Sequence, residues 1–227
     1  MKTKESMSAK VIAFALKGIN IKKNFTEGSY EKFISSKITE KKYQLPKLKY
    51  KCKTSKITIN EKDVYTFTLQ DSYDKNIIYL HGGAYVAEPN IYHVKLIDKI
   101  AYNTNSKVYM PIYPLSPNHT VEETYLLLEK LYNTLLNENK EIIIVGDSAG
   151  GGLALAFTEY LISKEKNKPS KLVLMSPWLD ITMCNEKIIN YAKQDPILDV
   201  YGLKKIGELW AKNLEKKEIL WYNNIKS

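Results

Sequence analysis

Hydrophobic residues along this chain follow two patterns, short apolar runs and helical spacings. Short runs of mostly β-branched or aromatic residues predict strands. Residues 91–103 and 120–135 instead place apolar side chains three or four positions apart, which predicts helices. Because strands and helices alternate through the middle of the chain, the pattern predicts an α/β fold with a mostly parallel sheet covered by helices on both faces. The predicted strands are residues 48–52, 57–60, 64–69, 77–80, 107–113, 142–145 and 171–176.

The two ends of the chain are predicted to contribute helices rather than strands. Residues 8–19 and, more weakly, residues 30–40 have amphipathic helical patterns, and residues 200–210 form a further predicted helix. Pro46 interrupts the chain before the first strand pattern. The sequence therefore predicts an N-terminal helical segment at 1–45 and an α/β core at 46–227.

A Gly-x-Ser-x-Gly motif at residues 146–150 lies between the strand at 142–145 and a helical pattern over 153–163. This strand–turn–helix context is the one that the motif requires, because the tight turn lifts the serine hydroxyl clear of the sheet edge. The helix N-terminus also directs unpaired N–H groups and partial positive charge at that position. Ser148 is therefore the candidate nucleophile, and an ordinary Gly–Ser turn in an α/β protein is the alternative.

A second glycine-rich turn, His-Gly-Gly-Ala at residues 81–84, directly follows the strand at 77–80. Glycines after a strand allow backbone N–H groups to face outward, as an oxyanion hole requires. An ordinary glycine turn is the alternative interpretation. With Ser148 downstream, the pattern favours an oxyanion hole.

Four motifs in this order and spacing resemble the hormone-sensitive-lipase-like group of α/β-hydrolase esterases, over about residues 45–210. Taken together, they are more specific than any one of them. They are His-Gly-Gly-Ala at 81–84, Tyr-Pro-Leu-Ser-Pro at 113–117, Gly-Asp-Ser-Ala-Gly-Gly at 146–151 and Ser-Pro-Trp-Leu-Asp at 176–180.

The resemblance implies that Ser148 attacks an ester carbonyl and that Gly82, Gly83 and Ala149 supply the N–H groups of the oxyanion hole. Ala84 stands where the group usually has a third glycine. Alanine is compatible with that position if its φ is negative.

The resemblance also implies a cap over the active site, formed by the N-terminal segment and the stretch around Asp195. Helices packed against the side of the core are the alternative for the N-terminal segment. Tyr85, Tyr113 and Trp178 are candidate walls of a substrate pocket, although aromatic residues at these positions are equally compatible with plain core.

The expected catalytic triad is incomplete in this sequence. A serine nucleophile needs a base and a carboxylate that holds the base, and in this fold both follow the serine. All three histidines, His81, His93 and His119, precede Ser148. We expect His93 to be a satisfied or surface histidine and His119 to be structural. The last strands of the fold, with the acid and the histidine, are therefore predicted to be missing.

Asp195 and Asp199 are candidates for the missing acid of the triad, but they match the cap segment rather than a loop after a strand. Three functions remain open: an esterase using Ser148, a truncated and inactive member of the group, and a small-molecule binding module. A sheet cut short also predicts self-association through its exposed edge.

Composition narrows the possible partners. The chain has 34 Lys and Arg against 25 Asp and Glu, a net charge of +9, but the lysines are scattered and no basic stripe alternates with aromatic residues, so nucleic acid is not predicted as a partner. The apolar run at 11–16 is short for a signal peptide, and no run approaches the roughly 20 apolar residues that span a bilayer. These features predict a cytoplasmic protein. The resemblance to the esterases implies a small ester as its partner.

Two cysteines, Cys52 and Cys184, lie far apart and outside any metal-ligand spacing, which predicts free thiols. The chain contains no metal-binding motif and no dinucleotide-binding fingerprint. No cofactor is therefore expected.

Overall fold

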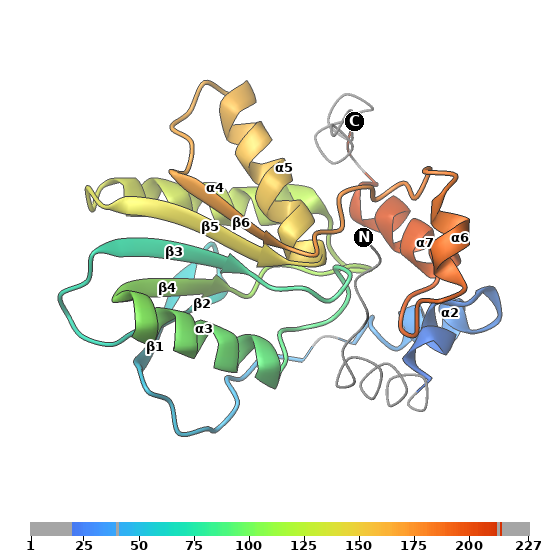
Figure 1. Ribbon diagram of the computed structural model, residues 1–227, viewed down its shortest axis with the longest axis horizontal. Coiled ribbons are helices and arrows are strands. Elements are labelled where there is room, and N and C mark those ends of the chain that lie inside the picture. The colour runs from blue at the N-terminus through green and yellow to red at the C-terminus, as the bar shows by residue number, and fades with distance from the viewer. Residues whose placement is uncertain (1–19, 40, 213, 215–227) are drawn as a thin grey trace, which may run out of the picture.

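The computed structural model describes residues 20–39, 41–212 and 214. Its centre is a six-stranded sheet in the order β1-β2-β4-β3-β5-β6 (Figure 1). The β1–β2 and β2–β4 pairs are antiparallel, and the other three pairs are parallel. The predicted mostly parallel α/β sheet is therefore confirmed. The strands are β1 (Lys53–Ile59), β2 (Lys62–Thr68), β3 (Lys75–Leu80), β4 (Ser106–Pro111), β5 (Glu141–Asp147) and β6 (Lys171–Met175).

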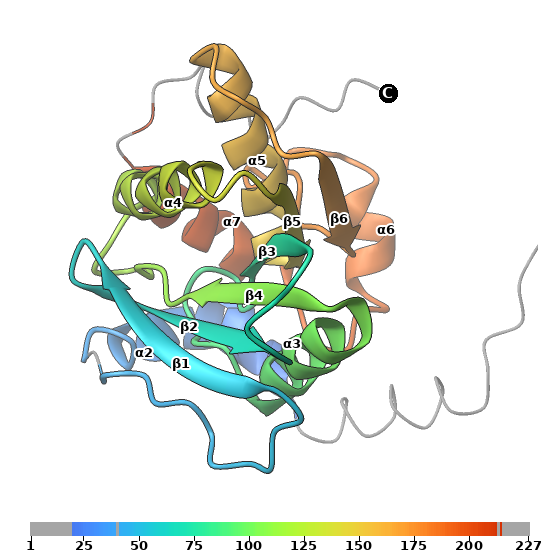
Figure 2. The same cartoon turned by 90° about the vertical axis from the view of Figure 1, so that its left-hand side faces the viewer.

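Three helices cover the two faces of this sheet: α3 (Ile91–Thr104), α4 (Val121–Leu136) and α5 (Ala149–Ser163). Helix α3 packs on one face, and α4 and α5 pack on the other (Figure 2). Helices α3 and α4 each bury an apolar face against the sheet, whereas α5 is buried over most of its length. This arrangement brings the carboxyl ends of the four parallel strands to one edge, where ligands bind in open α/β sheets.

A layer of helices stands beside that edge (Figure 1). It combines the N-terminal elements η1 (Ile21–Phe25) and α2 (Glu27–Ser35) with the late helices α6 (Ile188–Ala192) and α7 (Val200–Trp210). The Tyr30 and Tyr201 rings meet edge to face at 5.9 Å, and Lys22 Nζ donates a hydrogen bond to the backbone oxygen of Asp195 at 3.1 Å. Segments far apart in the sequence therefore form one layer.

The predicted helix at 200–210 is confirmed, whereas the one at 30–40 begins earlier, at Glu27, and ends at Ser35. The predicted helix at 8–19 lies outside the described residues. Helix α6 was not predicted, because it is a single turn that buries none of its side chains.

The strand predicted at residues 48–52 is wrong. The Asp98 carboxylate in α3 accepts hydrogen bonds from the backbone N–H groups of Lys51 and Cys52, at 3.0 and 2.9 Å. These N–H groups are therefore paired with a side chain rather than with a neighbouring strand. The alternation of apolar residues reflects anchoring of this segment against the core, not strand pairing.

The helix predicted at residues 120–135 is confirmed. Thr120 and Glu123 have the spacing of a capping box, but Thr120 makes no side-chain cap, and Glu123 Oε2 instead lies 2.7 Å from His119 Nδ1. The contact with the histidine occupies the carboxylate that would have completed the box.

Strand β6 is an outer strand of the sheet and, among the described residues, it pairs only with β5. Val173 at its centre is 45% exposed. Such an edge offers unpaired backbone groups to another strand. Self-association through it stays a prediction.

Two smaller findings concern the cysteines and the helices. Cys52, which is buried, and Cys184, which is exposed, are both free thiols, as the sequence predicted.

In the part of the chain that the structure describes, no helix combines the length and the apolar character needed to cross a membrane.

Candidate active site

Ser148 occupies the turn between β5 and α5, in the strand–turn–helix context that the motif predicted. Its backbone is strained, with φ 50° and ψ −120°. The flanking glycines make the turn possible: a Cβ on Gly146 would lie 2.3 Å from the Gly150 oxygen, and a Cβ on Gly150 would lie 2.0 Å from the Leu80 oxygen. Any side chain at either position would force the backbone apart.

Hydrogen bonds from three segments hold this turn in place. Ser148 N–H donates to the Met175 oxygen at 3.0 Å, and Trp178 N–H donates to the Ser148 oxygen at 2.8 Å. The Tyr85 hydroxyl donates to the Ala149 oxygen at 2.7 Å. Several constraints therefore maintain a conformation that serine would otherwise avoid.

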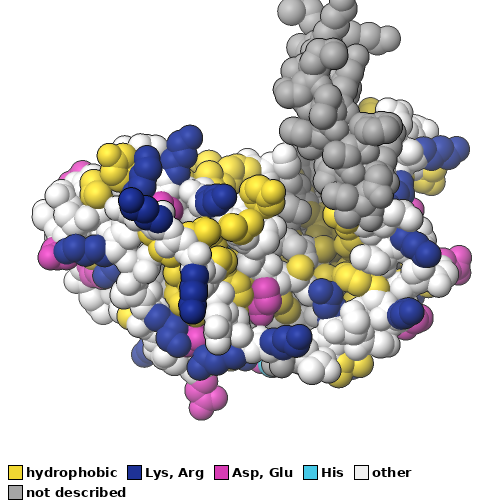
Figure 3. Space-filling view, turned by 90° about the horizontal axis from the view of Figure 1, so that it is seen from below, with side chains coloured by type: hydrophobic (Ala, Val, Ile, Leu, Met, Phe, Trp, Pro, Cys, Tyr) yellow, Lys and Arg dark blue, Asp and Glu magenta, His cyan; other side chains and the backbone are white. Residues whose placement is uncertain are grey.

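Ser148 opens onto a cavity of about 880 Å³ between the sheet edge and the layer of helices. Figure 3 shows the hollow between these two parts, with hydrophobic side chains on its walls. A large, mostly apolar cavity with few polar groups is typical of a small-molecule site. Its apolar walls include Phe25, Phe33, Trp178, Ile188, Leu198 and Leu203.

Of the three aromatic residues predicted as pocket walls, only Trp178 lines this cavity. Tyr85 is fully buried and stacks on Trp210 with ring centroids 4.4 Å apart, so it is core. Tyr113 faces a different cavity and stacks on His81 at 4.2 Å. Tyr85 is therefore a core residue, which was the alternative to a pocket wall.

The loop at residues 81–84 reaches the same cavity through Gly83 and Ala84. Ala84 has φ +51°, so the condition under which alanine was compatible with this position, a negative φ, is not met. The cause is a tight turn in which Val86 N–H and Ala87 N–H both donate to the Gly83 oxygen, at 3.1 and 3.0 Å.

The three predicted oxyanion-hole amides differ in their partners. Gly82 N–H donates to Asp147 Oδ1 at 3.0 Å and is therefore not free while that bond exists. Ala149 N–H lies in the first turn of α5, where amides have no partner within the helix. The amides of Gly83 and Ala149 make no hydrogen bond to another described residue, so they are the available donors.

Neither His81 nor His93, the histidines near the turn, hydrogen-bonds the Ser148 hydroxyl. His93 lies in α3 with Nδ1 2.9 Å from Asn90 N and Nε2 3.3 Å from Asp147 Oδ2, so both ring nitrogens are occupied, as expected for a satisfied histidine. His81 is fully buried, with Nδ1 2.8 Å from the Gly82 oxygen and Nε2 without a partner. Burial lowers its pKa to about 4.

The other candidates for an acid or base serve local structure. His119 pairs with Glu123. Asp195 accepts the backbone N–H groups of Ile197 and Leu198 in a turn, and Asp199 caps α7. Among the described residues no side chain hydrogen-bonds the Ser148 hydroxyl, and no cluster of His, Cys, Asp and Glu could hold a metal ion.

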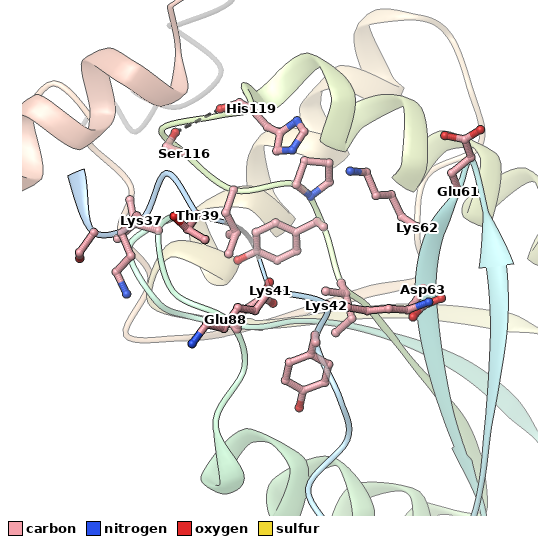
Figure 4. Close-up of a pocket in the computed structure, with 17 residues that line it drawn as sticks. Lys37, Thr39, Lys41, Lys42, Glu61, Lys62, Asp63, Glu88, Ser116 and His119 are labelled. Atoms are coloured by element: carbon pink, nitrogen blue, oxygen red, sulfur yellow. Dashed lines mark hydrogen bonds between the residues drawn. The ribbon is translucent and has the colours of Figure 1, made fainter. Parts of the chain in front are cut away.

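A second cavity, of about 610 Å³, adjoins the first and shares Lys37 and Val86 with it. Figure 4 shows that its lysines do not converge, because the Lys37 and Lys62 side chains lie well apart and Lys42 extends toward Asp63. Because the charged side chains of this cavity have both signs and do not converge on one point, they do not indicate a particular ligand.

Comparison with known proteins decides the family. A family model described as alpha/beta hydrolase fold matches residues 77–225, which include both the loop at residues 81–84, the candidate oxyanion loop, and the Ser148 turn. The chain belongs to this α/β-hydrolase family. A solved Staphylococcus aureus structure classed as an esterase is 32% identical with a TM-score of 0.81, over 88% of this chain and 71% of that one.

Other members extend the comparison. An esterase structure from the bacterial hormone-sensitive lipase family shares the fold, with a TM-score of 0.74 at 22% identity. A Mycobacterium tuberculosis triacylglycerol lipase is 35% identical over 61% of this chain, and an Acinetobacter venetianus esterase is 36% identical over 60%. The chain spans 28% and 46% of the lengths of these two curated relatives, less than half of each.

The sequence located the Ser148 turn but did not predict how the candidate oxyanion loop is held. The hydrogen bond from Gly82 to Asp147 joins residues 65 positions apart, and no local sequence pattern predicts it. The nearest signal was Asp147 itself, a charged residue between a buried strand and the candidate nucleophile.

Proposed function

We propose that this chain carries the nucleophile and the oxyanion hole of a carboxylic-ester hydrolase acting on small esters. The observation that carries the proposal is the strained turn at Ser148, which opens together with Gly83 onto a mostly apolar cavity of about 880 Å³. Relatives described as an esterase and a triacylglycerol lipase support an ester as the substrate.

In this proposal Ser148 Oγ attacks the carbonyl carbon of the ester, and its proton passes to a base. The carbonyl oxygen becomes negatively charged, and the Gly83 and Ala149 N–H groups stabilise it by hydrogen bonds. The tetrahedral adduct then expels the alcohol, which takes up a proton, and water releases the acid from Ser148. Gly82 could add a third bond only by leaving Asp147.

The described residues do not supply a base for the Ser148 proton. His93 uses both ring nitrogens elsewhere, and the free nitrogen of His81 is buried without a partner. Loss of the histidine of a catalytic triad lowers kcat by about 10⁶ in a well-studied serine protease. We therefore expect the described residues alone to turn esters over slowly.

A second candidate function, small-molecule binding without turnover, is favoured by the same observation. The apolar cavity can hold an ester or an acid even where Ser148 has no base. Binding would then stabilise the fold without product formation.

Hydrolysis of p-nitrophenyl acetate and butyrate by the purified chain, with and without added imidazole, separates the two functions. We expect slow hydrolysis that imidazole accelerates, since a free base can take the Ser148 proton. In Ser148→Ala only the background reaction of imidazole in solution should remain. If the folded wild-type chain matches Ser148→Ala in both conditions, the hydrolase proposal fails and binding without turnover is left.

A further inference from the structure

The Asp147 carboxylate, one residue before Ser148, receives hydrogen bonds from three different segments. Its Oδ1 accepts from the Tyr79 hydroxyl at 2.6 Å and from Gly82 N–H at 3.0 Å. Its Oδ2 lies 3.3 Å from His93 Nε2. The carboxylate therefore joins β3, the oxyanion loop and α3 to the nucleophile turn.

The position of the His93 proton follows from its neighbours. The Asn90 backbone N–H can only donate, and it lies 2.9 Å from His93 Nδ1, so Nδ1 accepts and the ring proton is on Nε2. That proton faces Asp147. Asn90 Oδ1 in return accepts from His93 N–H at 3.3 Å, which completes a capping box at the start of α3. The helix cap thus orients the donor that holds Asp147.

The bond from Gly82 to Asp147 fixes a very close approach. A Cβ on Gly82 would lie 2.4 Å from Asp147 Oδ2 and 3.1 Å from Ser148 Cβ. Gly82 is followed directly by Gly83, the available oxyanion donor of this loop. The same bond therefore sets how far the Gly83 amide lies from the nucleophile.

Burial and hydrogen bonding shift the pKa values of Asp147, Tyr79 and His81. Burial alone would raise the pKa of Asp147, but hydrogen bonds from His93 and Tyr79 outweigh it, so its pKa is lowered and it stays ionised. Burial raises the pKa of Tyr79, which keeps its hydroxyl a donor. Burial lowers the pKa of His81 to about 4, which keeps that ring neutral.

We propose that Asp147 is a positioning residue that holds the oxyanion loop against Ser148, with His93 and Tyr79 fixing its own orientation. The inference rests on the proposed hydrolase function. It assigns to Asp147 and His93 an effect on the rate of reaction at Ser148, and none on the binding of the reagent or substrate.

Asp147→Asn tests the inference, because an amide of the same shape directs an N–H group at one of the three donors. Labelling of Ser148 by a fluorophosphonate, followed over reagent concentration, gives a maximal rate and a half-saturating concentration. We expect the maximal rate to fall by about tenfold to a hundredfold, as a misplacement of about 1 Å costs, with the half-saturating concentration unchanged.

Glu138→Gln is the matched control. Glu138 also accepts three side-chain hydrogen bonds, from Tyr73, Asn76 and Tyr109, but at the opposite end of the sheet. This variant changes a similar network and should leave the maximal rate unaltered. An equal fall in both variants, or no fall in folded Asp147→Asn, would overturn the inference.

His93 provides a second pair of variants in case Asp147→Asn does not fold. His93→Ala removes the donor to Asp147 and should slow labelling, whereas His93→Gln retains an N–H donor and should recover most of the rate. Equal rates for the two folded variants count against the inference.

Hydrogen exchange at the Gly82 amide separates this inference from the proposed function. If wild-type chain is not labelled, the hydrolase proposal has failed, but exchange still reports the bond from Gly82 to Asp147. We expect exchange to be faster in Asp147→Asn than in wild type, and unchanged in Glu138→Gln. Unchanged Gly82 exchange in Asp147→Asn would show that Asp147 does not hold the loop.

Discussion

Acidification from pH 6.5 to pH 4 is expected to lower the free energy of unfolding by up to about 3 kcal/mol through His81 alone. His81 is fully buried, and burial lowers its pKa from 6.5 to about 4. Its Nε2 has no hydrogen-bond partner among the residues that the structure describes, so a proton there would add a buried charge without a partner in this part of the chain. Between these pH values the unfolded chain binds a proton that the folded chain does not.

The sign follows from this difference. The stabilisation is fully present above about pH 6.5, decreases as the pH falls, and changes no further below about pH 4. Urea unfolding of wild type and His81→Asn at several pH values measures it, because asparagine retains a donor for the Gly82 oxygen but cannot take up the proton. If both chains lose stability equally between pH 6.5 and pH 4, His81 does not carry the effect.

Replacing Trp210 by alanine is expected to destabilise the fold by about 3–5 kcal/mol, the range for removing a buried large aromatic side chain. Trp210 ends α7 and is fully buried, with its ring parallel to that of Tyr85 at 4.4 Å and tilted against that of Tyr113 at 6.3 Å. Its removal opens a cavity where the layer of helices meets the oxyanion loop.

Urea unfolding measures this loss, with Leu126→Ala as the control. Leu126 is 63% exposed on α4, so its truncation should change the stability by no more than about 0.5 kcal/mol. Trp210→Ala as stable as wild type would mean that α7 contributes little to the fold.

Much of the fold followed from local pattern. The apolar run at 142–145 and the helical pattern over 153–163 predicted β5 and α5, because both elements are largely buried and burial requires apolar residues. The glycines at 146 and 150 predicted the sharp turn between them, since only glycine fits there.

The errors share a physical cause, which is a partner distant in the sequence or a competing local contact. The segment at 48–52 alternates like a strand, but Asp98 takes the backbone bonds of Lys51 and Cys52. Tyr113 lies in a family motif, but its ring stacks on His81, outside the cavity of Ser148. Hydrophobic periodicity predicts which residues are buried, but it does not identify the groups that those residues contact.

The candidate site divides in the same way. Motif spacing identified Ser148 and the loop at 81–84, because both turns need glycine and both follow strands. It could not identify which amides of that loop remain free, since this depends on the bond from Gly82 to Asp147, or the positive φ of Ala84.

The most direct test of this account is labelling of the purified chain with a fluorophosphonate, with the modified residue identified by mass spectrometry. Ser176 lines the same cavity, so Ser176→Ala is the matched control for Ser148→Ala. The account predicts one modified residue, Ser148, with labelling lost in Ser148→Ala and retained in Ser176→Ala. Labelling that persists in Ser148→Ala, or a folded wild-type chain that takes up no label, would contradict it.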